Sequence, residues 1–169
     1  MTQLVEREKS IAQALHWLTQ QLGDTPYSIC GGLAAIAYGS QRDLNDIDLF
    51  VSEADFAPLV NQLQPYVSKP AQRYQGEGWD LEYVQLIYAG IKIEVGNPKD
   101  AFILNASTHK WQPLNVVFSA LSKVYLYGNE LSVMNKQDLI DYKNVLQREV
   151  DIDDVRAIKA AEGKQCQTT

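Results

Sequence analysis

A short stretch in the first third of the chain constrains the fold more than any other. The β-favouring residues 27–30 run directly into Gly31-Gly32, an apolar segment follows, and Asp46 and Asp48 then alternate with apolar residues at the start of a second β-favouring run. This pattern predicts a strand, a glycine turn, a short helix and a second strand that carries two acids. Because side chains alternate along a strand, both carboxylates project from one face, with their Cα atoms about 6 to 7 Å apart.

Two acids on one strand face indicate a cation site. Without a counter-ion the carboxylates of Asp46 and Asp48 repel each other, and Mg²⁺, which prefers carboxylate oxygens and commonly bridges to phosphate, would relieve that repulsion. A third acid would permit two ions about 3.5 to 4 Å apart for in-line attack on phosphorus. Glu94 is the best candidate, and Glu82 is its rival on the adjoining predicted strand. The ordinary alternative is a half-exposed strand edge with solvated acids.

The remaining sequence predicts helices and strands in irregular alternation. We expect a helix over 4–22, a helix after Ser52 to about residue 67, hairpins over 79–95 (turning at Ala89-Gly90) and 123–134 (turning at Gly128-Asn129), and two helices after Asn135. The expected fold class is α+β, a mixed β-sheet flanked by helices with C-terminal helices. One domain is expected over residues 1–169, with a core at about 25–134 and a C-terminal helical segment at about 135–163.

Composition excludes several classes of protein. The 169 residues carry a formal charge of −6 with scattered basic residues, which makes nucleic acid an improbable partner. No apolar run is long enough to span a bilayer and the N-terminus lacks the apolar region of a signal peptide, so we expect no membrane partner and a cytoplasmic protein. Cys30 and Cys166 are expected to be free thiols. Neither His16 nor His109 has a visible partner for nucleophilic catalysis.

The glycine pair and the two acids together resemble the nucleotidyltransferase fold of the DNA polymerase beta superfamily. Its signature is a Gly-Gly or Gly-Ser pair, a spacer and an h-D-h-D-h strand, which here reads "CGG" followed by "NDIDLFV". Thirteen residues separate Gly32 from Asp46, which suits the family, whereas five separate Ser40 from the same aspartate. The resemblance therefore selects Gly31-Gly32, and Gly39 is expected to end the helix, where glycine can adopt positive φ.

The stretch from Gly31 to Val51 is similar to the small-molecule branch of this family, which includes lincosamide and aminoglycoside nucleotidyltransferases. In that branch an Arg and a Thr or Asn precede the paired acids, and Arg42 and Asn45 occupy those places. The resemblance implies that Arg42 neutralises phosphate charge of the nucleotide and that Asn45 orders the loop. For each residue the alternative is a solvated loop side chain.

The C-terminal segment resembles the tail of the same branch. A helix with an internal lysine leads there through Arg and Asp to a second helix, and Lys143 and Arg148 are the matching positions. The resemblance implies that Lys143 reaches the nucleotide phosphates or the acceptor, and the alternative is a solvated helical lysine. Asp151 and Asp154 are expected to cap and orient the last helix.

The resemblance implies an enzyme that moves a nucleoside monophosphate from an NTP to a hydroxyl of an unidentified acceptor, a small molecule or a protein. Asp46 and Asp48 would ligate Mg²⁺, Glu94 would bind a second ion or deprotonate the hydroxyl, and Gly31-Gly32 would hold the triphosphate. Antibiotic-modifying relatives carry a further acceptor-binding domain or dimerise, so a homodimer is one expectation. The alternatives are a catalytically weak or inactive, antitoxin-like regulator that binds another protein, and a small binding domain without nucleotide chemistry.

Overall fold

One mixed β-sheet organises the computed structural model, which describes the backbone of residues 2–166 and the side chains through Lys164. Its eight strands are β1 (Tyr27–Cys30), β2 (Ile47–Val51), β3 (Val67–Gly76), β4 (Trp79–Tyr88), β5 (Ile91–Asn105), β6 (Lys110–Pro113), β7 (Ser122–Leu126) and β8 (Asn129–Val133). The helices are α1 (Thr2–Leu22), α2 (Gly31–Ala37), α3 (Glu53–Gln62), a 3₁₀ turn η1 (Gln64–Tyr66), α4 (Lys136–Leu146) and α5 (Glu149–Cys166). These elements confirm the predicted α+β class.

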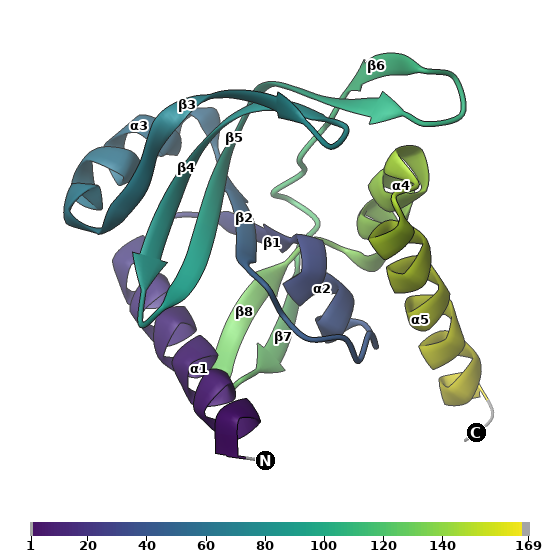
Figure 1. Ribbon diagram of the computed structural model, residues 1–169, viewed down its shortest axis with the longest axis horizontal. Coiled ribbons are helices and arrows are strands. Elements are labelled where there is room, and N and C mark those ends of the chain that lie inside the picture. The colour runs from purple at the N-terminus through teal and green to yellow at the C-terminus, as the bar shows by residue number, and fades with distance from the viewer. Residues whose placement is uncertain (1, 167–169) are drawn as a thin grey trace.

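The strands are ordered β3-β4-β5-β2-β1-β8-β7, and β6 pairs with β5 outside this series. Strand β2 runs parallel to β5, and β1 runs parallel to β8, whereas the other pairs are antiparallel. Figure 1 shows α1 and α3 on the left of the sheet in that view, and α2, α4 and α5 on its right. The sheet is therefore mixed and flanked by helices, as the irregular alternation predicted.

Alternation along β2 and β5 separates the core from a polar face. Ile47 pairs with Ile93 and both are fully buried, while the next pair along the two strands is Asp48 with Glu94. Because paired residues of neighbouring strands share a face, the apolar pairs enter the core and the two acids stand together on the opposite face. The sheet core thus fixes where these carboxylates lie.

The structure confirms both predicted helix caps and one of the two predicted hairpin turns, and it shifts the other turn by one residue. The side chains of Ser52 and Asn135 cap α3 and α4 by accepting hydrogen bonds from backbone N–H groups three residues later. The first hairpin turns at Ala89 and Gly90, with φ of 52° and 74°. The second turns at Tyr127 and Gly128, one residue earlier than predicted, because these two residues take the positive φ values.

Two strands escaped prediction, and one helix ends earlier than expected. Strand β3 is an edge strand whose side chains are mostly exposed, so its sequence lacks the apolar alternation that marks a strand, and an edge strand also tolerates Pro70. Strand β6 is short and mostly exposed. Helix α3 ends at Gln62 and the chain tightens into η1, where Pro65 occupies the first turn.

Two expectations from composition concern the cysteines and the membrane. Cys30 is free and buried, which agrees with the prediction, and the side chain of Cys166 lies outside the described part of the chain. Among residues 2–166, no helix combines the length and the apolar character that crossing a bilayer requires.

Gly39 provides a test of the fold that is independent of any ligand. Its φ of 126° is a conformation that L-residues rarely adopt, and an added Cβ would lie 2.5 Å from the Cβ of Ala161 on α5. We expect Gly39→Val to lower the free energy of unfolding by about 2 kcal/mol or more in urea titrations. Gly163→Ala, a position with open space around it, is the control and should leave stability unchanged or raise it. Equal stabilities of the two variants would contradict this account.

Candidate functional site

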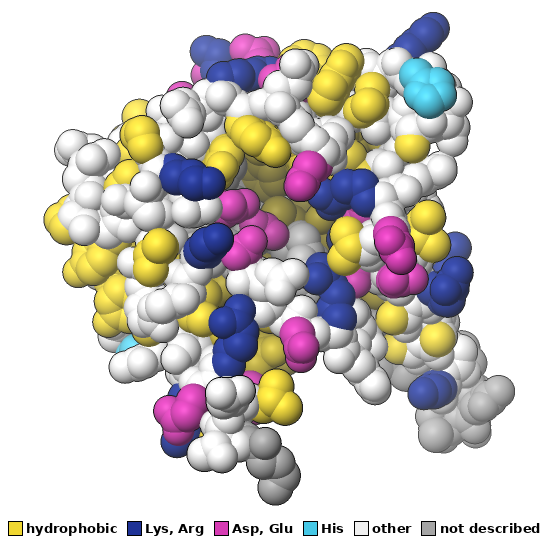
Figure 2. Space-filling view, viewed as in Figure 1, with side chains coloured by type: hydrophobic (Ala, Val, Ile, Leu, Met, Phe, Trp, Pro, Cys, Tyr) yellow, Lys and Arg dark blue, Asp and Glu magenta, His cyan; other side chains and the backbone are white. Residues whose placement is uncertain are grey.

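A cavity of about 520 Å³ opens where the sheet faces α2, α4 and the start of α5. Figure 2 shows this face hollowed near its centre, with acidic side chains in the hollow and basic side chains around it. The glycine pair, the paired acids and the cations named from the sequence all line this one cavity: Gly31, Gly32, Arg42, Asn45, Asp46, Asp48, Glu94, Lys143 and Arg148. Segments that are more than a hundred residues apart in the sequence therefore meet at one place.

The acidic wall of the cavity is built on β2 and β5. Asp48 and Glu94 are direct partners in the parallel register, and Asp46 lies just before β2. Glu82, the rival third acid, does not line this cavity, and its carboxylate accepts a hydrogen bond of 2.9 Å from Asn97 Nδ2. The geometry thus places Glu94 beside the paired aspartates and leaves Glu82 outside.

Burial and the crowding of like charges raise the pKa of Asp48. Burial, the charges of Glu94 and Asp46, and a hydrogen bond with Glu94 raise the pKa of Asp48 to about 7, although the nearby Lys143 acts in the opposite direction. Glu94 also accepts a hydrogen bond of 3.1 Å from Gln85 Nε2. Near neutral pH the Asp48 carboxyl is therefore poised between its protonated and ionised forms, and a cation would compete with its proton.

The acids meet only part of what a metal site requires. Within the described residues, no three His, Cys, Asp or Glu side chains gather closely enough to form a metal-binding group. Mg²⁺ is commonly held by one or two carboxylates, with substrate phosphates and waters completing its shell, and not by an all-protein cage. The paired carboxylates of Asp48 and Glu94, with Asp46 close enough to shift the pKa of Asp48, fit that partial ligand set.

Each glycine of the pair makes room for one charged group of the site. A Cβ on Gly31, whose φ is 60°, would collide with Asp48 Oδ2. A Cβ on Gly32 would lie 2.5 Å from Nη2 of Arg42. The positive φ favours glycine at position 31, and at position 32 the missing Cβ lets the Arg42 guanidinium pack directly against the backbone.

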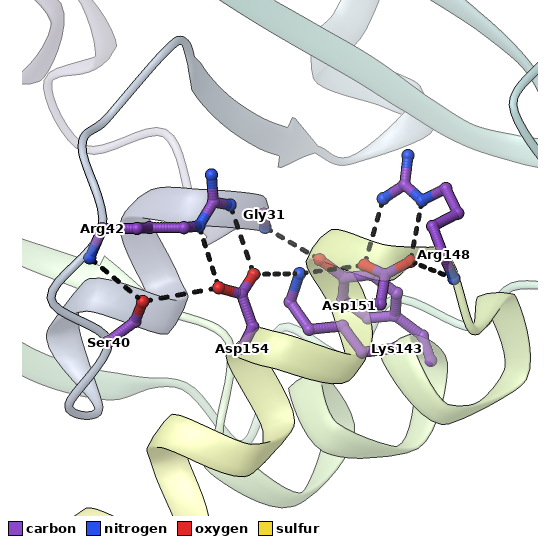
Figure 3. A network of polar contacts seen from close by, with 8 residues as sticks. Gly31, Ser40, Arg42, Lys143, Arg148, Asp151 and Asp154 are labelled. Atoms are coloured by element: carbon purple, nitrogen blue, oxygen red, sulfur yellow. Dashed lines mark hydrogen bonds and ion pairs between the residues drawn. The ribbon is translucent and has the colours of Figure 1, made fainter.

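The basic wall of the cavity consists of Arg42, Lys143 and Arg148, each bound to a carboxylate of α5 (Figure 3). Lys143 is 2% exposed, and its Nζ lies 2.9 Å from Asp154 and 3.2 Å from Asp151. The interpretations of Arg42 and Lys143 as solvated side chains are therefore wrong, because both cations are held in ion pairs.

The two acids of α5 differ in their roles. Asp151 accepts a hydrogen bond of 3.2 Å from the backbone N–H of Arg148 and one of 2.7 Å from Arg148 Nε, so it caps the start of α5 as predicted. Asp154 lies inside the helix and accepts two hydrogen bonds from Arg42, at 2.8 Å from Nε and 3.2 Å from Nη2. Asp154 is therefore a tertiary ion-pair partner and not a cap.

Asn45 lines the cavity from the loop before β2, whereas the two histidines lie outside it. Asn45 is exposed, and its backbone carbonyl accepts a hydrogen bond of 3.2 Å from Arg7 on α1, which ties the loop before β2 to that helix. His16 and His109 are exposed and do not line the cavity. Their positions give them no contact with the acids.

The aromatic residues of the site were not predicted from the sequence. Tyr142 is buried beside Lys143, and its hydroxyl accepts a hydrogen bond of 2.8 Å from the Gly31 N–H. Trp79 and Tyr83 of β4 also line the cavity. Tyr83 lies two residues from Gln85, the register partner of Glu94, so strand alternation alone would have placed it on the acidic face.

The raised pKa of Asp48 predicts an unusual pH dependence of stability. Since the pKa is higher in the folded protein than in the unfolded chain, the metal-free protein loses stability as pH rises from about 4 to about 7. Asp48→Asn removes this loss, so we expect the variant to be more stable than the parent by about 1 to 3 kcal/mol at pH 8 in EDTA, with a smaller difference at pH 5.5. Urea unfolding measures both values. Glu82→Gln, outside the cavity, should show no such trend, and a destabilised Asp48→Asn at pH 8 would refute the assignment.

Comparison with known proteins identifies the fold. No protein-family profile and no curated protein sequence matches this chain. A provisionally assigned nucleotidyltransferase from Thermotoga maritima superposes with a TM-score of 0.66 at 18% identity, over 85% of this chain and 89% of that one. The lincosamide adenylyltransferase LnuA bound to lincomycin superposes with a TM-score of 0.59 at 15% identity, over 90% of this chain and 96% of that one. ANT(2'')-Ia in complex with adenylyl-2''-tobramycin superposes with a TM-score of 0.60 at 12% identity, over 91% of this chain and 90% of that one. The chain thus has the fold of these nucleotidyltransferases.

Proposed function

We propose that this protein is a Mg²⁺-dependent enzyme that transfers a nucleoside monophosphate from an NTP to a hydroxyl of a small-molecule acceptor, with release of pyrophosphate. One observation carries the proposal: the cavity sets the carboxylates of Asp48 and Glu94 on its sheet wall and the cations Arg42, Lys143 and Arg148 on its other wall. A metal-bound triphosphate has the complementary distribution of charge, since its metal seeks carboxylates and its phosphate oxygens seek cations.

The acidic wall would hold the metal. Asp46 and Asp48 would be its ligands, and Glu94 would either hold a second ion or accept the proton of the acceptor hydroxyl. When bound, Mg²⁺ supplies electrostatic stabilisation of the charge that develops on the phosphoryl oxygens. The near-neutral pKa of Asp48 supports this assignment, because a ligand that is costly to ionise alone becomes favourable to ionise beside a cation.

The basic wall would bind the phosphates. Arg42 commits Nε and Nη2 to Asp154, which leaves Nη1 as a donor toward the cavity. Lys143 has one of its three donors beyond the two ion pairs with α5. Gly31 and Gly32 would serve the phosphates by letting the Asp48 carboxylate and the Arg42 guanidinium pack against the backbone beside them, and Asn45 would contact the nucleotide from the loop before β2. Two walls of opposite charge would thus position the nucleotide for attack by the acceptor hydroxyl.

The acceptor is proposed to be a small molecule with a flat or apolar part. The solved structures of LnuA and ANT(2'')-Ia contain lincomycin and adenylyl-2''-tobramycin. In this chain the cavity has aromatic lining from Tyr74, Trp79 and Tyr83, which suits contact with a ring. We further propose that the reaction takes place in the cytoplasm, where NTPs are available.

A ligand-dependent shift in melting temperature tests the proposal. We expect each accepted NTP to raise the melting temperature of the protein when Mg²⁺ is present and to have a much smaller effect in EDTA. Asp48→Asn should abolish the part of this rise in melting temperature that depends on Mg²⁺. Release of pyrophosphate during incubation with hydroxyl-bearing compounds then measures turnover. Absence of any NTP effect would refute the proposal, and binding without turnover over a broad acceptor set would favour the regulatory alternative.

Gly32 offers a sharper test of the phosphate side of the cavity. Because a Cβ there would lie 2.5 Å from Nη2 of Arg42, Gly32→Ala should displace the guanidinium while leaving the fold largely intact. We expect roughly tenfold weaker NTP binding, about 1.4 kcal/mol, in isothermal titration calorimetry. Gly163→Ala is the matched control and should bind like the parent. Unchanged NTP affinity in Gly32→Ala would remove this glycine and its contact with Arg42 from the site.

A further inference from the structure

Asp154 lies at the centre of a buried charge network behind the cavity wall. Its side chain is fully buried, and its two oxygens contact Arg42 Nε at 2.8 Å, Arg42 Nη2 at 3.2 Å, Lys143 Nζ at 2.9 Å and Ser40 Oγ at 3.4 Å. Figure 3 shows this carboxylate between Arg42 on one side and Lys143 on the other. A residue of the last helix thus holds the loop that follows α2 and the end of α4 together.

In this network the cations lie at the cavity and the carboxylates lie behind them. Arg42, Lys143 and Arg148 line the cavity, whereas Asp151 and Asp154 do not. The five side chains alternate in sign, in the order Arg42, Asp154, Lys143, Asp151 and Arg148. Three cations against two carboxylates leave this network with one net positive charge, and its cations, unlike its carboxylates, line the cavity.

Stability alone is a poor explanation for this arrangement. Buried ion pairs often contribute little net free energy to folding, because desolvation offsets the attraction. Arg42 retains 27% of its side-chain exposure and could turn to solvent at small cost. What the bidentate contact does supply is orientation, since it fixes the plane of the guanidinium against Gly32.

We propose that Asp154 is a positioning residue for nucleotide binding, which orients Arg42 and Lys143 so that their remaining donors face the phosphates. This inference rests on the proposed function and adds that α5 sets phosphate affinity without touching the nucleotide. A preorganised cation binds an anion more tightly than a mobile one, because less side-chain freedom is lost on binding. Asp151 orients Lys143 and Arg148 in the same way, through its ion pairs with both side chains.

Inorganic tripolyphosphate with Mg²⁺ is the probe that tests this role, because it has phosphates and no base. By calorimetry we expect Asp154→Asn to bind it at least tenfold more weakly than the parent. The loss should be large for the accepted NTP and small for the corresponding monophosphate, a gradient that general loosening of the fold would not produce. Asp153→Asn changes the exposed neighbouring acid of α5 and should match the parent. Parent-like affinity in Asp154→Asn, or an equal loss for NTP and monophosphate, would overturn the inference.

Arg42→Lys keeps the test decisive if Asp154→Asn does not fold. Lysine retains the charge on this partly exposed side chain but cannot make the bidentate contact with Asp154. We expect several-fold weaker tripolyphosphate binding, and parent-like binding would refute the need for orientation. Failure of the parent itself to bind tripolyphosphate and every NTP would refute the proposed function and this inference with it. Binding by the parent with both variants unaffected would refute the positioning role alone.

Discussion

The parallel pairing of β2 with β5 is the constraint on which the rest of the site depends. It buries Ile47 against Ile93 and, one step along, forces Asp48 beside Glu94. A shift of one residue in this register would turn the apolar side chains outward, so the core cannot relieve the repulsion by sliding the strands. The fold therefore maintains two carboxylates that disfavour each other, and the opposite wall supplies cations that partly offset them, as Lys143 does for Asp48.

Patterns confined to neighbouring residues could be read from the sequence. Alternation placed Glu94 on the face opposite the core, and the caps at Ser52 and Asn135 were visible because a side chain and the helix it caps are adjacent in the chain. The spacing of the glycine pair from Asp46 indicated which glycines work with the acids. The alternation and the caps each involve residues that are close together in the chain, within one hairpin or about two turns of helix. The glycine spacing is longer and was informative only because it resembles a known motif.

Contacts between distant segments could not be predicted in the same way. Arg42 and Asp154 are 112 residues apart, and Gly31 and Tyr142 are 111 apart. A buried lysine looks like any other helical lysine until its partners are known, since burial of a charge is tolerable only with ion pairs from other elements. The polar edge strand β3 had no apolar periodicity because its side chains are mostly exposed and neither of its faces is buried in the core.

The hydrogen bond from the Gly31 N–H to Tyr142 has a consequence for the order of events during synthesis. The acids on β2 and β5 leave the ribosome before α4 and α5, which carry Lys143, Asp151 and Asp154. Until those helices dock, Arg42 lacks its buried partner and the Gly31 amide lacks its acceptor. The nascent chain therefore carries the acids of β2 and β5 before the cations Lys143 and Arg148, and the charge pattern of the cavity is complete only after α4 and α5 have docked.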